Sequence, residues 1–186
     1  MKAWKTNGRG VSSRRWVGVL VVLLGVTAVP ARAGDSPLDG EKIASHVRQF
    51  RSRDAFAVVQ AIQGAHRRLA DSRCQAIFSD FAKASGQRLQ EVLDEQGQTG
   101  QSHLRRLLFY DGAQTSSCRV PGVLAATQPE SRAIFICSSW FREAFELNPR
   151  KVEAVIIHEL LHSLGLGENP PRSQDITARV VARCGG

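Results

Sequence analysis

Residues 155–168 read V-I-I-H-E-L-L-H-S-L-G-L-G-E and contain the pattern that decides the fold: a histidine, a glutamate, two further residues and a second histidine. Residues four apart on a helix lie on the same face, so His158 and His162 can direct two imidazoles at one metal ion. Glu159 projects from the adjoining part of this helix, where its carboxylate can reach a water molecule on the metal and act as a general base. The stretch therefore predicts an apolar helix with a Zn²⁺ site on one face.

The residues after the second histidine extend this pattern. Gly165 can adopt the left-handed conformation that ends a helix, and Glu168 follows three residues later. A carboxylate can act as a zinc ligand, so we expect Glu168 to be the third ligand. Asp175 is the alternative third ligand, although it also fits the first turn of a following helix, where an acidic side chain interacts favourably with the helix dipole.

The run from His158 to Glu168 resembles the active-site motif of the zincin metallopeptidases, and in particular the metzincin pattern H-E-x-x-H-x-x-G-x-x-H. It matches at both histidines, at Glu159 and at Gly165, and it departs at Glu168, where the metzincins have a third histidine. The metzincin Met-turn is also missing, because the only methionine is Met1. The resemblance covers the active-site helix and its exit turn, and it implies a compact zincin-like domain that hydrolyses peptide bonds.

The same resemblance implies two further features of the site. In zincins one strand borders the substrate cleft and pairs with an extended peptide, and Ala133–Cys137 could be this strand or an ordinary core strand. Many zincins also use a downstream tyrosine or histidine to stabilise the tetrahedral oxyanion, but neither residue type follows His162. Tyr110 and His103 are therefore the candidates for this role.

The first 33 residues have the features of a secretory signal. A basic segment without acidic residues precedes the apolar stretch Val17–Val29, and Ala31–Ala33 has the A-x-A pattern of a cleavage site. A 13-residue apolar stretch is short for a transmembrane helix, although an uncleaved anchor is the alternative. We expect residues 34–186 to form a single exported domain, secreted or periplasmic, without stable membrane association after signal cleavage.

The charge of the chain gives little reason to expect a nucleic-acid partner. The full chain carries a net charge of +8, but residues 1–33 hold six of its 25 lysines and arginines and none of its 17 acidic residues. Removing this segment leaves a net charge of +2. The high isoelectric point is thus largely a property of the predicted signal, and no nucleic-acid binding is expected.

The predicted mature chain contains all four cysteines of the sequence. An even number of cysteines in an exported chain indicates disulfides. Of the possible pairings we favour Cys118–Cys137, which would tie a loop to a strand, and Cys74–Cys184, which would fasten the last helix to the N-terminal half. No cysteines show the C-x-x-C spacing of a second zinc site.

Hydrophobic periodicity predicts an α+β fold, with a helical N-terminal half, a small sheet, the active-site helix and a C-terminal helix. Helices are expected at residues 41–70, 72–84, 89–97, 140–145, 150–164 and 173–183. Strands are expected at residues 107–110, 123–126 and 133–137. Residues 96–102 are polar and contain glycine, which is typical of a loop.

These features together predict a zinc-dependent peptidase that acts on a peptide or protein substrate, with Glu159 as general base. Three alternatives stay open. The chain could be an exported domain in which zinc has only a structural role, a peptidase-like binding or inhibitor module that has lost its open metal position, or an amide hydrolase that uses the same residues on the cell wall. The sequence gives no indication of the oligomeric state.

Overall fold

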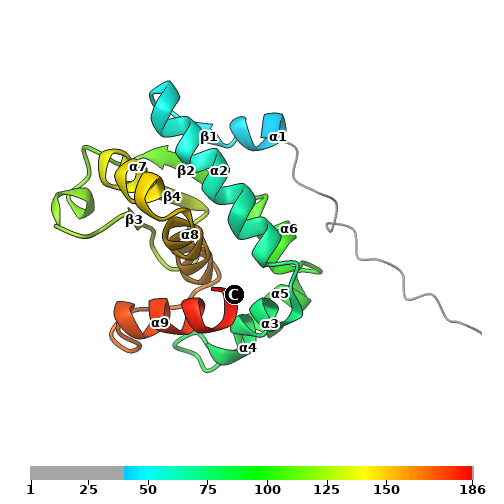
Figure 1. Ribbon diagram of the computed structural model, residues 1–186. Coiled ribbons are helices and arrows are strands. Elements are labelled where there is room, and N and C mark those ends of the chain that lie inside the picture. The colour runs from blue at the N-terminus through cyan, green and yellow to red at the C-terminus, as the bar shows by residue number, and fades with distance from the viewer. Residues whose placement is uncertain (1–39, 186) are drawn as a thin grey trace, which may run out of the picture. The chain divides into compact units, whose positions relative to one another are not determined.

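The computed structural model describes residues 40–185 (Figure 1), so the expected signal segment lies outside the described residues. The fold is α+β, as the sequence predicts. The helices are α1 (Gly40–Ala44), α2 (Ser52–Arg68), α3 (Ser72–Gln75), α4 (Ile77–Asp80), α5 (Leu89–Glu95), α6 (Gly100–Leu104), the short 3₁₀ helix η1 (Ser117–Arg119), α7 (Ser138–Leu147), α8 (Pro149–Ser163) and α9 (Ser173–Cys184). The strands are β1 (Val47–Arg48), β2 (Leu108–Asp111), β3 (Ala125–Ala126) and β4 (Ala133–Ile136).

The sheet is small and mixed, with the strand order β1-β2-β4-β3. The first three of these strands run parallel, while β3 runs antiparallel to β4 and forms one edge. Side chains alternate between the two faces of a strand, and in β4 this places Ile134 and Ile136 in the core while Phe135 is 38% exposed. One face of the sheet is therefore buried, and the other is partly open to solvent.

Helix α8 is the element against which the other long helices pack. It contacts α2, α7 and α9, and it lies between α2 and α9 in Figure 1. Ile156, Leu160 and Leu161 have 0% exposed surface, and burying a side chain of this size contributes about 1.5 to 3 kcal/mol. The apolar residues around the two histidines thus hold this helix in the core.

The start of α8 is fixed by local sequence. The side chain of Asn148 accepts a hydrogen bond from the backbone N–H of Lys151, and Pro149 occupies the first helical position. Both residues are favoured there, because an N-cap satisfies an otherwise unpaired donor and proline has no N–H to leave unpaired. The helix predicted at residues 150–164 is therefore confirmed to within one residue at each end.

The helix predicted at residues 41–70 is interrupted. The chain leaves α1, forms β1, and turns at Gln49, which has a φ of +67°, before α2 begins. Strand β1 exists because it pairs with β2, more than fifty residues later in the sequence. Local periodicity cannot reveal such a long-range pairing, so this part of the prediction was wrong.

Two smaller differences have local causes. The helix predicted at residues 72–84 is replaced by α3 and α4 and ends at Phe81, which is extended with φ −123° and ψ 155°. The expected loop at residues 96–102 contains the start of α6, because the Thr99 hydroxyl accepts a hydrogen bond from the N–H of Ser102 and caps a helix there.

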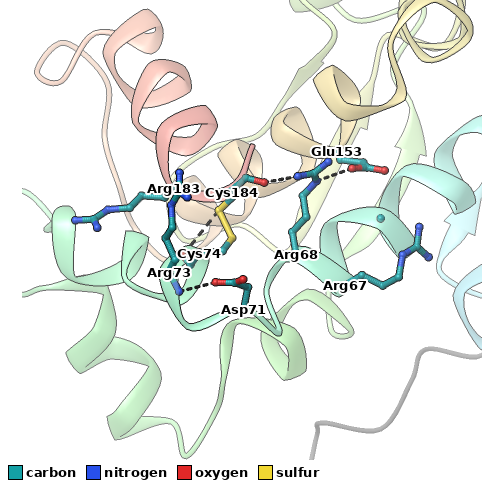
Figure 2. Close-up of a pocket in the computed structure, with 9 residues that line it drawn as sticks. Arg67, Arg68, Asp71, Arg73, Cys74, Glu153, Arg183 and Cys184 are labelled. Atoms are coloured by element: carbon teal, nitrogen blue, oxygen red, sulfur yellow. Dashed lines mark hydrogen bonds and ion pairs between the residues drawn. A yellow bond between two sulfur atoms is a disulfide. The ribbon is translucent and has the colours of Figure 1, made fainter. Parts of the chain in front are cut away.

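Both favoured disulfides are present, Cys74–Cys184 and Cys118–Cys137. The first fastens the end of α9 to α3, and Figure 2 shows it beside a cavity of about 380 Å³. Disulfides persist in oxidising compartments, so the two bridges indicate that the chain folds outside the cytoplasm. Among residues 40–185, every helix is too short or too polar to cross a membrane.

Candidate metal centre

His158 and His162 occupy successive turns of α8, and Glu168 lies opposite them on the loop that follows. The two Nε2 atoms are 3.0 Å apart, and Oε1 of Glu168 lies 3.6 Å from Nε2 of His158 and 3.3 Å from Nε2 of His162. Tetrahedral zinc with ligand distances of about 2.0 to 2.1 Å would separate its ligand atoms by about 3.4 Å. His158, His162 and Glu168, together the metal group, could therefore hold one metal ion, as the sequence predicts.

The exit turn of α8 brings Glu168 to the histidines. Gly165 has a φ of +106°, which side chains other than glycine rarely adopt. The N–H of Gly165 bonds to the carbonyl of His162, and the N–H of Leu166 bonds to the carbonyl of Leu161. This pair of hydrogen bonds is the Schellman ending of a helix, and it reverses the chain so that the next residues pass beside the metal group.

Each histidine is oriented through its second ring nitrogen. Nδ1 of His162 lies 2.7 Å from the carbonyl oxygen of Leu166, and Nδ1 of His158 lies 3.0 Å from the hydroxyl of Thr177 on α9. A carbonyl oxygen can only accept a hydrogen bond, so His162 donates its Nδ1 proton to it. The Nε2 lone pair is then free for a metal.

The surroundings of His158 favour the form that binds metal. Burial and, to a smaller extent, the neighbouring His162 lower the pKa of His158, Glu168 acts in the opposite direction, and the net result is a pKa of about 4. Only the neutral imidazole can act as a ligand. The site therefore holds His158 ready for a metal around neutral pH.

Glu159 is a buried acid, and few groups among the described residues hydrogen-bond to its carboxyl group or offset its charge. It is 5% exposed, and its Oε2 atom has no hydrogen-bond partner in the described part of the chain. Burial raises the pKa of Glu159 to about 8, the charge of Glu168 raises it as well, and the backbone of Thr127 lowers it. Buried polar atoms without a partner are rare in folded proteins, and a strongly shifted acid in a cavity is a candidate for proton transfer.

The metal group and Glu159 line one cavity of about 450 Å³. Both acids contribute to its wall, and no lysine or arginine is among the lining residues. The remaining lining residues are Ser117, Val120, Val123, Ala125, Ala126, Thr127, Gln128, Pro129 and Ser173. One side of the cavity thus comes from β3 and its flanking loops, and the other from α8 and the start of α9.

Strand β3 turns its unpaired edge toward this cavity. The N–H of Cys137 bonds to the carbonyl of Leu124 at 2.9 Å, so Leu124 and then Ala126 form the hydrogen-bonded pairs with β4. The N–H and C=O of Ala125 therefore point away from β4, and those of Thr127 continue this pattern. The cavity consequently has main-chain donors and acceptors along one wall.

Of the two roles left open for Ala133–Cys137, the structure supports that of an ordinary core strand. Strand β4 pairs with β2 on one side and with β3 on the other, so it has no free edge. The edge position falls to β3, which the sequence predicts only as a weak strand. Its short length and small side chains gave little periodic signal.

Asp175 is not part of the metal group. Both of its oxygens accept hydrogen bonds from the guanidinium of Arg172, at 2.9 and 3.0 Å. It lies in the first turn of α9, where an acid interacts favourably with the helix dipole. Asp175 thus lies outside the His158, His162 and Glu168 group, and its position as a first-turn acid, the other role predicted for it, is confirmed.

The two candidates for an oxyanion donor lie elsewhere. Tyr110 packs against Phe135 on the sheet, with ring centroids 5.8 Å apart. His103 bonds to the hydroxyl of Ser163 at 3.0 Å and to the side chain of Gln98 at 2.9 Å, in a separate cavity of about 500 Å³. Neither side chain lines the cavity of the metal group.

Sequence reasoning missed the residues that support the group. Thr177 reaches His158 from another helix, and the contributions of Leu166 and Thr127 come from their backbone. A hydroxyl on a later helix and two backbone groups leave no pattern in a sequence. Only the nearness of Leu166 to the exit turn could have pointed to its role.

Comparison with known protein families, curated proteins and solved structures gives no match for this chain. The function is accordingly inferred from the residues and geometry of the site.

Proposed function

We propose that this chain is an exported zinc-dependent peptidase of the zincin type. The observation that carries the proposal is Glu159, a buried acid with an unpartnered oxygen, in one cavity with His158, His162 and Glu168. A buried carboxylate oxygen without a hydrogen-bond partner destabilises a fold. Its presence beside a group that could hold a metal supports a chemical role.

Zinc is the metal that the side chains fit best. Two imidazole nitrogens and one carboxylate oxygen form the ligand set of many catalytic zinc sites, in which a fourth position stays open. A bound zinc ion would make a water molecule acidic near neutral pH and polarise a substrate carbonyl. The open side of the group would face the cavity, where a substrate could enter.

In this mechanism Glu159 moves the proton. It accepts a proton from water as the water oxygen attacks the carbonyl carbon, and it delivers that proton to the leaving nitrogen as the C–N bond breaks. A carboxyl group with a raised pKa suits this exchange, because the best catalytic acid or base has a pKa near the working pH. A bound cation would lower that pKa again, toward the form that accepts a proton.

An extended peptide is the substrate that the cavity wall supports best. The free N–H and C=O of Ala125 could pair with the backbone of a peptide added at the edge of β3. Such pairing recognises the main chain and would hold a peptide bond beside Glu159. This arrangement is similar to the edge-strand recognition implied by the zincin resemblance.

The structural zinc site and the cell-wall amide hydrolase are less well supported. A purely structural zinc site has no use for Glu159, whose burial would then be an uncompensated cost. A cell-wall amide hydrolase would use the same acid and metal group, but the edge of β3 favours a regular extended backbone. Two disulfides agree with a secreted or periplasmic peptidase.

A zinc titration of the metal-stripped chain tests the proposal. Cleavage of casein should rise with added zinc and level off at one ion per chain, and a chelator should reverse it. Glu159→Gln, titrated in parallel, should bind zinc with the same stoichiometry without cleaving casein. Zinc bound at the site without cleavage of casein or of a mixed peptide pool would contradict the proposal and favour the structural role.

A further inference from the structure

A tight turn in the wall of the cavity places two valines next to each other. Residues 120–123 read V-P-G-V, with proline and glycine at the two central positions. Gly122 has a φ of +87°, and the N–H of Val123 bonds to the carbonyl of Val120 at 3.3 Å. These are the features of a type II β-turn, which brings its first and fourth Cα atoms to within about 7 Å. Val120 and Val123 therefore lie side by side.

The turn is held in place by its neighbours. Cys118 stands two residues before Val120 and is bonded to Cys137 at the end of β4. A Cβ atom added to Gly112 would lie 3.1 Å from Sγ of Cys118 and 2.9 Å from Cβ of Phe135, so the loop packs closely against the sheet. The two valines thus keep a fixed position relative to β3.

Both valines line the same cavity as the metal group and Glu159. Val120 is 52% exposed although it is a branched apolar residue, so a ligand that covers it would remove apolar surface from water. The ionisable residues of the cavity wall are Glu159 and the three residues of the metal group, and no lysine or arginine lines it. The wall is therefore apolar at the turn and acidic at Glu159 and Glu168.

We propose that Val120 and Val123 form an apolar subsite that receives an aliphatic side chain of the peptide substrate. The inference rests on the proposed function, which supplies the identity of the occupant. The turn leads directly into β3, so a peptide paired with Ala125 passes beside the two valines. The side chain it presents there loses contact with water against their methyl groups, whereas alanine would bury less apolar surface and a charged side chain would lose hydration without a lysine or arginine to pair with.

Cleavage of a peptide pool tests the subsite. The pool contains quenched peptides in which the three residues on each side of the scissile bond are varied in turn among Leu, Val, Ala, Lys and Asp. For the zinc-loaded chain we expect kcat/KM to be at least about tenfold higher with Leu or Val than with Ala at one position. Val120→Asp should bring that ratio close to one at the same position and leave the other positions unchanged.

Val181→Asp is the matched control, because Val181 is 51% exposed, close to the 52% of Val120, and lies on α9 outside the cavity wall. It should keep the aliphatic preference of the natural chain. Thermal unfolding of both variants establishes that they are folded. A preference that survives Val120→Asp, or the lack of an aliphatic preference at every position, overturns the subsite.

A binding measurement separates failure of the subsite from failure of the peptidase assignment. Fluorescence anisotropy with zinc-loaded Glu159→Gln compares labelled peptides that differ only in Leu or Ala at the chosen position. Tighter binding of the Leu peptide that is lost when Val120→Asp is added supports the subsite, even if the natural chain cleaves nothing. Cleavage without any such preference overturns the subsite and leaves the peptidase assignment intact, and the lack of both cleavage and preferential binding overturns both.

Discussion

Two glutamates on helix α8, six residues apart, have opposite surroundings. The side chain of Glu153 is 13% exposed and pairs with the guanidinium of Arg68 at 2.5 Å. Arg68 also donates to the carbonyl of Cys184, so this contact joins α2, α8 and the end of α9 (Figure 2). Glu159 is 5% exposed, has an unpartnered oxygen, and has its pKa raised to about 8.

The difference separates an acid that supports the fold from an acid that is available for chemistry. The chain makes room for the ion pair of Glu153, because a Cβ atom added to Gly64 would overlap its side chain, at 2.1 Å from Oε1. Among residues 40–185 no lysine or arginine forms an ion pair with Glu159, and none lines its cavity. Burial alone therefore does not mark a candidate for a functional acid, whereas an unpartnered carboxylate oxygen beside a group that could hold a metal does.

The largest expected effect comes from exchanging each acid for its amide. Glu159→Gln should lower kcat on a peptide substrate by about 10³-fold, the size typical for removal of a general base, while one zinc ion stays bound per chain. Glu153→Gln should keep peptidase activity near that of the natural chain, because Glu153 does not line the site. Steady-state kinetics on zinc-loaded protein measures both, and equal losses of activity would break the comparison.

Removal of Glu168, the proposed third ligand, should have the next largest effect. Glu168→Ala should weaken zinc binding by more than about 100-fold, because removing a direct ligand costs more than removing the residues that orient one. Asp175→Ala should leave zinc binding unchanged, since the partner of Asp175 is Arg172. Competition with a coloured zinc chelator measures the affinities, and equal effects of the two substitutions would contradict the assignment of the ligands.

The effects of the two substitutions on stability should have the opposite order to their effects on activity. Glu153→Gln should lower the free energy of unfolding by about 2 to 3 kcal/mol, because it leaves the mostly buried Arg68 without its carboxylate partner. Glu159→Gln should leave stability unchanged or raise it, since it removes a buried ionisable group that lacks compensation. Urea unfolding of the metal-free proteins measures both values. A loss in Glu159→Gln as large as that in Glu153→Gln would show that both acids are structural.

The hydroxyl that orients His158 gives the smallest effect. Thr177→Val removes its hydrogen bond to Nδ1 with little change in shape, so zinc affinity should fall by about tenfold. Thr177→Ser keeps the hydroxyl and should keep most of the affinity. Isothermal calorimetry measures both variants, and a loss in the serine variant equal to that in the valine variant would assign the effect to packing instead.

The features that the sequence predicted depend on residues close together in the chain, and those that it missed depend on contacts between distant segments. Helix α8, its Gly165 ending and Glu168 lie in one short stretch, where helical spacing and turn chemistry determine the geometry. The favoured disulfides followed from the expected order of helices and strands along the chain. These features depend on local sequence or on a few covalent links, which is why the sequence alone could predict them.

The features that were missed depend on contacts between distant segments. Strand β1 forms only through β2, the ion pair of Glu153 needs Arg68 from another helix, and Thr177 comes from α9. The unpartnered oxygen of Glu159 is likewise a property of its surroundings, since nothing in its own segment distinguishes it from an acid that forms an ion pair, such as Glu153. The structure was needed to separate the two glutamates.

Mass spectrometry of a peptide pool incubated in ¹⁸O-labelled water with the zinc-loaded chain tests the central claim most directly. Hydrolysis by water predicts cleaved products that carry one ¹⁸O atom in each new terminal carboxylate. The same incubation with zinc-loaded Glu159→Gln should leave the peptides intact, while Glu153→Gln should give the labelled products. Intact peptides with the natural chain at full zinc occupancy, or labelled products from Glu159→Gln at the natural rate, would contradict the account.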